Sequence, residues 1–380
     1  MLPSKLPHLG TTIFTVMTDR ARELGAINLA QGFPDYDPPE LLKQLVAEQV
    51  MAGRNQYAPM IGVAELREQI GEQVKQRHGW APHIDNEITI TLGATEAIFS
   101  SIQALVHAGD EVILFDPSYD SYAPSVLLAG GVPVHIPLQP PHFQYDWELI
   151  KSAFSPKTRL VIINTPHNPT ATVATRDDFL ELENLAIRFG AFVLSDEVYE
   201  HMVYDGREHV SVLSRPALRE RSIAVYSFGK SMHATGWRVG YAIAPAEITR
   251  ELRRVHQFNT FSISAPMQYA IAEFLRRAPE HNRELPQFYQ SKRDYFLAQL
   301  QGSKLRPLVS QGTYFQLLDF SACSDLNDME YADVLLREAG VASIPLSPFY
   351  AKPIELSVLR FCFAKRESTL LEAARRLRSV

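Results

Sequence analysis

From Glu87 onward, short apolar runs alternate with stretches of helical periodicity. The apolar runs cover residues 88–92, 111–115, 160–164, 192–195, 223–227 and 239–244. Runs of this length, separated by helices, are typical of a mostly parallel sheet that helices cover on both faces. Several runs end in polar residues, and in such a sheet the binding site lies beyond the carboxyl ends of the strands. The middle of the chain therefore predicts an α/β layered domain with a site at one edge of its sheet.

The length of the chain predicts more than one structural unit. With 380 residues, it exceeds the size at which a single hydrophobic core stops growing. We expect a large domain over residues 41–284 and a smaller carboxy-terminal α+β domain over 285–380. The amino-terminal segment, residues 1–40, is expected to be part of the small domain. The pattern of the small domain is a helix at 292–300, a strand at 314–318, a helix at 331–338, a strand at 359–363 and a closing helix.

Composition and charge exclude several kinds of protein. The net charge is -6 and no tract of Lys or Arg occurs, so we expect no nucleic-acid partner. No segment approaches the roughly 18 consecutive apolar residues of a membrane span, and residues 1–8 lack the apolar core of a secretory signal. We therefore expect a cytoplasmic protein without a membrane partner. Cys323 and Cys362 form no Cys-x-x-Cys pair and the 12 histidines have no ligand spacing, so we assign neither a disulfide nor a metal site.

Residues 227–240, with the sequence SFGKSMHATGWRVG, place one lysine between small residues directly after a β-branched run. We expect a strand, a tight turn that presents Lys230, and a second strand. A lysine that is held rigidly and partly desolvated has a lowered pKa and becomes a competent Schiff-base nucleophile. Ser227 and Arg238 supply a hydroxyl and a guanidinium, a pair that suits a phosphate group. The alternative is an ordinary surface lysine in a polar loop.

Two further segments place polar groups at the ends of apolar runs. Residues 93–97 (GATEA) open a helix expected over 97–106, so backbone N–H groups at Ala94 and Thr95 would face an anion such as a phosphate. The alternative is a plain helix start with Thr95 as its cap. Asp196 ends another run, where a buried carboxylate is costly unless it meets a cation. The alternative for Asp196 is a helix cap.

Taken in order, these motifs resemble a known family. The pattern Ser-x-Gly-Lys-x-x-x-x-Thr-Gly-Trp-Arg-x-Gly resembles the cofactor-lysine segment of class I aminotransferases. These enzymes have the PLP-dependent transferase fold type I and use pyridoxal 5′-phosphate (PLP). The likeness extends from residues 28–35 (NLAQGFPD) to residues 359–364 (LRFCFA), and it is nearest to the methionine aminotransferase and kynurenine (glutamine) aminotransferase group.

The resemblance implies a role for each matching residue. Lys230 would form the resting Schiff base with PLP and later shuttle a proton, while Asp196 would pair with the pyridinium nitrogen. The other implied cofactor contacts are Asn168 and Tyr199 at the phenolic oxygen, Tyr119 on the ring face, and Ala94, Thr95, Ser227 and Arg238 at the phosphate. Tyr57 would reach the phosphate of the other subunit of a homodimer. Without the resemblance, an interface or core aromatic is the favoured interpretation of Tyr57.

Substrate contacts are implied in the same way. Arg360 would bind the α-carboxylate bidentately. The other implied substrate contacts are Gly32 and Phe33, from the irregular loop at 31–35, together with Ile13 and Asn168. Residues 258–266 contain no arginine of the kind that aspartate-specific relatives use, so we expect an apolar side-chain pocket lined by Ile13, Phe14, Phe33, Tyr57, Phe258 and Phe261.

One motif departs from the family pattern. Asn168 and Pro169 are followed by Thr170, Ala171 and Thr172, whereas the family continues Asn-Pro-x-Gly. The departure leaves Asn168 in place and leaves the conformation of the following turn open.

The implied function is transfer of the amino group of methionine, and also of aromatic amino acids, histidine and glutamine, to a 2-oxo acid. Two alternatives stay open. A PLP-dependent carbon–sulfur β-lyase acting on cysteine conjugates would share every anchor residue. A non-catalytic regulator that kept the fold would need an added basic DNA-binding segment, and residues 1–40 offer none.

Overall fold

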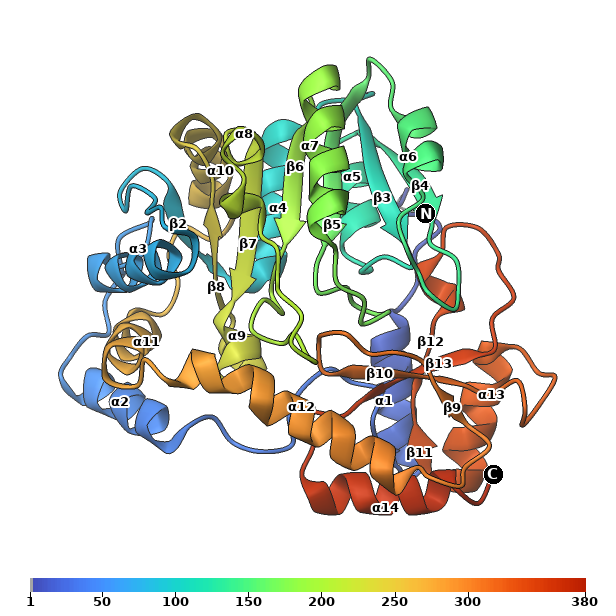
Figure 1. Ribbon diagram of the computed structural model, residues 1–380. Helices are drawn as coiled ribbons and strands as arrows, with labels where there is room; N and C mark the ends of the chain where they lie inside the picture. Colours follow the sequence, from blue (N-terminus) through green and yellow to red (C-terminus); the bar gives the residue numbers. More distant parts are fainter. Residues whose placement is uncertain (1–2) are drawn as a thin grey trace.

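The computed structural model describes residues 3–380 and is built around a seven-stranded sheet (Figure 1). The strand order is β2-β8-β7-β6-β5-β3-β4. The strands are β2 (Ile88–Leu92), β3 (Glu111–Asp116), β4 (Val132–Pro137), β5 (Thr158–Asn164), β6 (Phe192–Asp196), β7 (Ser222–Ser227) and β8 (Val239–Ile243). All neighbouring pairs from β4 to β7 are parallel, whereas β8 pairs antiparallel with both β7 and β2. The predicted α/β fold with a mostly parallel sheet is confirmed.

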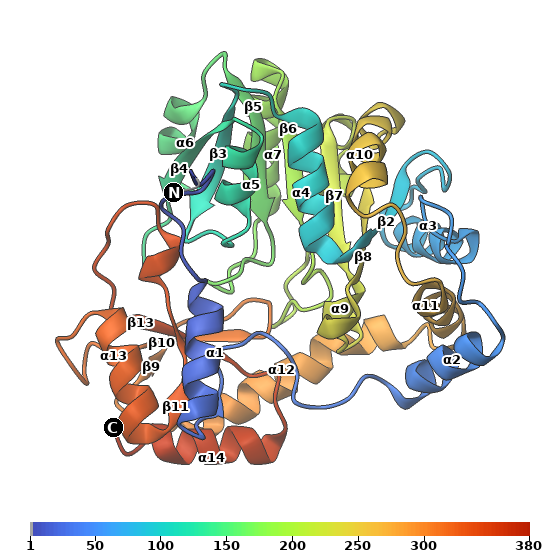
Figure 2. The same ribbon diagram turned by 180° about the vertical axis from the view of Figure 1, so that it is seen from behind.

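Helices cover both faces of this sheet because its strands are apolar on both faces. Along β5, Leu160 and Ile162 pack on one side, while Val161 and Ile163 pack on the other. The first side is covered by α4 (Gly93–Leu105), α5 (Tyr122–Leu128) and α10 (Ala246–Asn259), seen in front in Figure 2. The second side is covered by α6 (Trp147–Ala153), α7 (Arg176–Phe189) and α8 (Pro216–Arg219). Helices α2 (Glu40–Met51), α3 (Ala64–His78) and α11 (Ala265–Arg277) pack together beside the β2 edge.

The smaller unit contains a four-stranded antiparallel sheet in the order β12-β13-β10-β9. Its strands are β9 (Arg306–Pro307), β10 (Phe315–Asp319), β12 (Ile344–Pro345) and β13 (Val358–Cys362). A parallel pair, β1 (Ile27–Asn28) with β11 (Val341–Ala342), brings the amino-terminal segment into this unit. Its helices are α1 (Ile13–Glu23), α12 (His281–Gln299), α13 (Asp328–Val334) with its π-helical continuation η3 (Leu335–Ala339), and α14 (Glu367–Leu377). Helix α12 crosses position 285, so we keep the division of the chain at 284/285 as a proposal.

The lysine segment differs from the expected tight turn. Lys230 lies in α9 (Phe228–Ser231), a single helical turn, and the 3-10 turn η2 (Thr235–Trp237) follows before β8. The chain folds back closely on itself at Gly229, where a Cβ would lie 3.1 Å from Thr235 Cα. Helix α4 likewise begins at Gly93 and not at Ala97, and no side chain caps it. The interpretation of Thr95 as a helix cap is therefore wrong.

Strand β4 and helix α1 are among the elements that were not expected from the sequence. Strand β4 contains Pro133 and Pro137, and it forms because it lies at the edge of the sheet, where proline is tolerated. Helix α1 begins after Thr12, whose side chain accepts a hydrogen bond from Thr15 N–H. Two short 3-10 turns, η1 (Val212–Ser214) and η4 (Ser347–Phe349), complete the described elements. No helix within residues 3–380 is long and apolar enough to cross a membrane.

Candidate active site

The carboxyl ends of neighbouring strands bring several predicted residues together. Asp196 is the last residue of β6, Ser227 is the last residue of β7, and Asn168 follows β5. Asn164, which sequence reasoning did not select, fixes this edge: its Nδ2 donates to the carbonyl of Asp196 at 2.8 Å and its Oδ1 accepts from the N–H of Asn168 at 2.7 Å. Its position at the end of an apolar run was the available signal.

Asp196 is a buried carboxylate that forms no ion pair within residues 3–380. The hydroxyl of Tyr122 donates to Oδ2 at 2.7 Å, and the N–H of Val198 donates to Oδ1 at 3.3 Å. Burial raises the pKa of Asp196 to about 6, while these two hydrogen bonds act to lower it. No helix begins at Asp196, so the helix-cap alternative is wrong. The site offers a carboxylate to a positively charged group.

Lys230 is partly buried, and its amine lies beside two tyrosine rings. Its Nζ lies 5.7 Å from the ring centre of Tyr199 and 5.9 Å from that of Tyr314. Burial and, to a smaller extent, the positive charge of Arg238 lower the pKa of Lys230 to about 8, although Asp196 acts to raise it. The amine is therefore substantially neutral near pH 8 and able to act as a nucleophile or base. The surface-lysine alternative does not fit this environment.

Arg238 lies against the first turn of α4. A Cβ on Gly93, which has φ +70°, would lie only 2.7 Å from Nη2 of Arg238. Within residues 3–380, Arg238 forms no salt bridge with a carboxylate, and its Nη1 donates to the carbonyl of Thr235 at 3.1 Å. Ala94 and Thr95 belong to that first turn, where backbone N–H groups have no partner within the helix. The Thr95 hydroxyl lies 3.5 Å from the hydroxyl of Tyr119. An unpaired guanidinium beside a helix N-terminus fits a phosphate group.

Arg360 carries a buried positive charge that no acidic side chain neutralises. Its Nη1 donates to Asn168 Oδ1 at 2.6 Å and its Nη2 donates to the carbonyl of Ala30 at 2.8 Å. Its Nε has no partner within residues 3–380, and its guanidinium lies 3.9 Å from the ring centre of Phe315. Burial lowers the pKa of Arg360 to about 10. Since a buried unpaired cation is unfavourable, this site is suited to binding an anion.

The apolar residues predicted around the substrate fall into two groups. On α1, Phe14 lies 5.0 Å from the Arg360 guanidinium and 5.3 Å from the Phe349 ring. Ile13, Gly32 and Phe33 also lie on the small unit, and the Gly32 carbonyl accepts from the Tyr314 hydroxyl at 2.6 Å.

The second group is the exposed aromatic patch, which we define as Tyr57, Phe258 and Phe261. Tyr57 is 86% exposed and Phe258 is 87% exposed. The Tyr57 and Phe261 rings lie 5.6 Å apart. Among residues 3–380, no hydrogen bond or ring contact joins this patch to Lys230, so the structure does not bring Tyr57 into the site of its own chain.

The turn after Asn168 keeps the shape that glycine would favour. Ala171, at the position where the resembling family has glycine, adopts φ +61°. Its N–H donates to the carbonyl of His167 at 2.8 Å, and its carbonyl accepts from Gly312 N–H at 3.0 Å. These contacts hold an alanine in a conformation that costs on the order of 1 kcal/mol. Alanine in place of glycine therefore leaves the conformation of this turn unchanged in kind, with a positive φ at residue 171.

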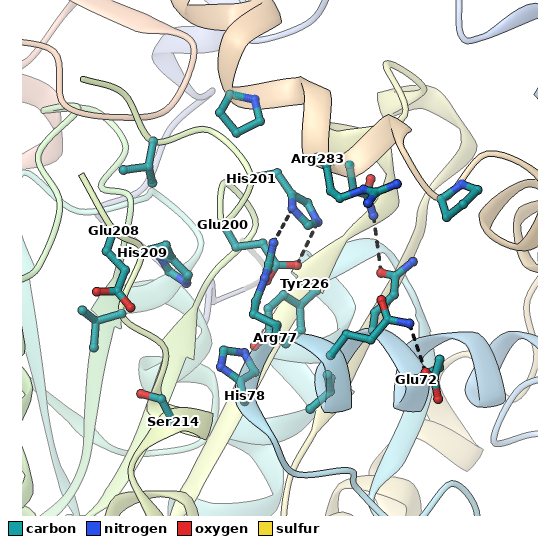
Figure 3. A pocket seen from close by; sticks show the side chains of 18 of the residues that line it. Glu72, Arg77, His78, Glu200, His201, Glu208, His209, Ser214, Tyr226 and Arg283 are labelled. Carbon is teal, nitrogen blue, oxygen red and sulfur yellow. Dashed lines mark hydrogen bonds and ion pairs between the residues drawn. The ribbon is translucent and has the colours of Figure 1, made fainter. Parts of the chain in front are cut away.

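A separate cavity of about 1390 Å³ lies between α3, α12 and the segment that follows β6 (Figure 3). Of the predicted site residues, none lines it. Arg77 forms an ion pair with Glu200 there, and its Nη2 lies 2.6 Å from Nδ1 of His201. Ligand atoms of Glu197, Glu200 and His209 lie within 4.8 Å of one another. Because Arg77 already pairs with Glu200, and Glu197 accepts from Tyr226 and lies 3.0 Å from His209, we assign no metal to this group.

Comparison with known proteins identifies the family. The family model "Aminotransferase class I and II" matches residues 25–377. Methionine aminotransferase of Escherichia coli is 53% identical over 99% of this chain and 98% of its own length. Kynurenine–oxoglutarate transaminase 1 of Rattus norvegicus is 34% identical over 94% of this chain and 92% of its own. The crystal structure of YbdL from Escherichia coli, reported with a methionine aminotransferase function, superposes with a TM-score of 0.98 at 53% identity and covers 100% of both chains.

The chain belongs to the class I and II aminotransferases. It is an aminotransferase, and its cofactor is PLP. The residues present fit that cofactor. The buried carboxylate of Asp196 can bind a cation, and the guanidinium of Arg238 lies beside the N-terminus of α4. Lys230, whose pKa is lowered, lies close to Asp196.

Proposed function

We propose that this chain transfers the amino group of methionine to a 2-oxo acid, and that aromatic amino acids, histidine and glutamine are further donors. The observation that carries the proposal is the buried Arg360, which has no acidic partner within residues 3–380 and has aromatic rings beside it. One cation suits the α-carboxylate that all amino acids share. Residues 258–266 supply no second cation for an acidic side chain. The 53% identity to the methionine aminotransferase of Escherichia coli supports the same substrate.

We propose the following roles for the residues of this site. When bound, PLP withdraws electrons from the α-carbon of the amino acid. Arg360 would bind the α-carboxylate, and the neutral Lys230 Nζ would move the proton between the α-carbon of the substrate and C4′ of the cofactor within each half-reaction. Asp196 stabilises the protonated pyridine nitrogen. The remaining proposed contacts are Asn168 and Tyr199 at the phenolic oxygen, Tyr119 on the ring face, Ala94, Thr95, Ser227 and Arg238 at the phosphate, and Ile13, Gly32 and Phe33 around the substrate.

The test is a panel of amino-acid donors with one 2-oxo acid acceptor, compared by kcat/KM. A thioether side chain gains roughly 1.5 to 3 kcal/mol on burial, whereas a buried unpaired carboxylate costs several kcal/mol. We expect methionine to exceed aspartate and glutamate by about a hundredfold or more. Arg360→Lys is the control, and it should slow every donor by a similar factor because all share the α-carboxylate. Faster turnover of aspartate than of methionine would contradict the proposal.

We further propose that the enzyme is a cytoplasmic homodimer. The exposed aromatic patch supports a dimer, since apolar rings that water surrounds in one chain are typical of a surface that a partner covers. A second copy would also supply Tyr57 to the phosphate site. Two-fold symmetry is the commonest closed arrangement. Light scattering on the purified holoenzyme should give twice the mass of the chain, and an active monomer would contradict the assembly.

A further inference from the structure

A buried pair of side chains joins α4 to α10. Glu96 lies in the first turn of α4, and His256 lies near the end of α10, where it is fully buried. Nδ1 of His256 is 3.0 Å from Oε1 of Glu96, and the hydroxyl of Ser100 donates to the same oxygen at 2.6 Å. The other carboxylate oxygen accepts from the N–H of Leu92 at 3.2 Å. The carboxylate therefore has protein donors on both oxygens, and the side chain of Glu96 is only 6% exposed.

The contact made by Nε2 of His256 indicates which ring nitrogen carries hydrogen. Nε2 of His256 is 3.0 Å from the carbonyl oxygen of Met60. A carbonyl oxygen can only accept, so Nε2 carries hydrogen. One further proton is then shared between Nδ1 and Glu96, either on the ring or on the acid. In both arrangements the pair has no net charge.

The absence of net charge on the pair matters because Glu96 lies beside the turn proposed for the cofactor phosphate. Glu96 follows Ala94 and Thr95 directly, and these residues form the turn proposed for the cofactor phosphate together with Arg238. A phosphate is stabilised at a helix N-terminus by unpaired N–H groups and by the helix dipole. An uncompensated carboxylate one residue away would oppose it. The imidazole at Glu96 removes that opposing charge.

The same imidazole reaches the segment that carries Tyr57. Met60 lies three residues after Tyr57, and the hydroxyl of Ser262 donates to the carbonyl of Ala58 at 2.9 Å. The carbonyl of His256 accepts from the N–H of Phe261 at 2.9 Å. His256 therefore contacts the start of α4 and also the two segments that carry the exposed aromatic patch.

We propose that Glu96 and His256 are positioning residues for the cofactor phosphate: His256 neutralises Glu96 beside the phosphate turn and fixes that turn relative to the Tyr57 segment. The proposal rests on the proposed function for the location of the phosphate. It assigns neither residue a contact with the substrate. Its consequence is specific, because loss of His256 should weaken binding of the phosphate and leave binding of the pyridine ring unchanged.

The test compares two ligands of the apoprotein by fluorescence titration: PLP, and pyridoxal, which lacks the phosphate. We expect His256→Gln to weaken PLP binding by about tenfold and to leave pyridoxal binding within about twofold. Adding Glu96→Gln to His256→Gln removes the uncompensated charge and should return PLP affinity to within about threefold of the wild type. Rescue of this kind distinguishes a charge effect from damage to packing.

His209→Gln is the matched control. His209 is also buried and its Nε2 lies 3.0 Å from a carboxylate oxygen of Glu197, but it lies at the separate cavity of Figure 3. This variant should leave the ratio of PLP to pyridoxal affinity unchanged. A parallel loss of both affinities in His256→Gln, an unchanged PLP affinity, or no rescue by Glu96→Gln would each overturn the proposal.

A measurement on the unaltered holoenzyme covers the case in which His256→Gln does not fold. Nitrogen-15 NMR of labelled histidine should show hydrogen on Nε2 of His256 throughout the pH range in which the protein is folded, and an Nε2 without hydrogen would overturn the assignment. Neither experiment depends on turnover. A failure of the methionine proposal in the donor panel is therefore distinguishable from a failure here.

Discussion

The hydroxyl of Tyr122 lies 2.7 Å from Oδ2 of Asp196 and donates a hydrogen bond to it. Tyr122 is buried, and its ring contacts that of Tyr119 edge-on, with centres 5.6 Å apart. Tyr122 thus hydrogen-bonds to Asp196, which is proposed to pair with the pyridine nitrogen. It also packs against Tyr119, which is proposed to stack on the cofactor ring. The hydrogen bond favours the ionised form of Asp196, which burial alone disfavours.

Replacing Tyr122 by phenylalanine should loosen the cofactor. The substitution keeps the ring and removes the donor, so the pKa of Asp196 should rise above its value of about 6 in the wild type. A hydrogen bond to a charged group contributes about 1.5 to 3 kcal/mol, so we expect PLP affinity to fall by roughly ten- to a hundredfold. Equilibrium titration of the apoprotein measures this. Tyr145→Phe, which removes the hydroxyl of a ring that packs against Phe115 and Trp147, is the control and should have no effect. Equal losses in both variants would contradict the role of Tyr122.

The apoprotein should become more stable when Asp196 is replaced by asparagine. The pKa of Asp196 rises from 3.8 to about 6 on folding, so the folded state disfavours the ionised form. The cost is absent below pH 3.8, grows between pH 3.8 and 6, and is complete above pH 6. We expect Asp196→Asn to raise the free energy of unfolding by on the order of 1 to 3 kcal/mol at pH 7.5 and to give no gain at pH 3.8.

Urea denaturation of the PLP-free protein at both pH values measures this difference. The same variant should hold PLP less firmly, because the asparagine amide cannot neutralise a protonated ring nitrogen. A gain in stability that is equal at both pH values would show that the substitution acts through something other than the charge.

Attachment of PLP to the protein should follow the titration of Lys230. Burial lowers the pKa of this amine to about 8, and only the neutral amine is a nucleophile. The rate of covalent attachment should therefore be half-maximal near pH 8. Borohydride fixation and peptide mapping should place the label on Lys230, and Lys157→Ala, at an exposed position, should not change it. A label on any other lysine would refute the assignment of Lys230.

Sequence reasoning was most successful where a residue's neighbours along the chain determine its place. Asp196 and Ser227 end apolar runs, and parallel strands bring such ends to one edge of a sheet. The fold class followed from this pattern, whereas the family was identified from the resemblance of residues 227–240 and the other motifs. The helical turn at Lys230 was missed because it depends on how closely Gly229 approaches the returning chain at Thr235, a contact that no local pattern specifies.

Residues that act across long separations were harder to find. Tyr122 lies 74 positions before Asp196, and its contact forms only because α5 packs on the sheet near β3 and β4. His256 lies 160 positions after Glu96. A signal existed for Tyr122, since it lies three residues after Tyr119 in the same segment that follows the apolar run at 111–115. For His256 the sequence offers no comparable signal, because a lone histidine on a helix is most often part of the core.

Mixing two inactive variants should restore activity if Tyr57 serves the neighbouring subunit. Lys230→Ala lacks the reactive amine, and Tyr57→Ala lacks a side chain that is 86% exposed and makes no contact with Lys230 in its own chain. A hybrid dimer has one site in which Lys230 comes from the Tyr57 variant and Tyr57 comes from the Lys230 variant. With random pairing, half of the dimers are hybrids with one intact site each, so roughly a quarter of wild-type turnover should return. Mixing Lys230→Ala with Arg360→Ala is the control and should restore nothing, because Lys230 and Arg360 act in the same chain. If the Tyr57 mixture also stays inactive after subunit exchange, Tyr57 does not act across a dimer interface.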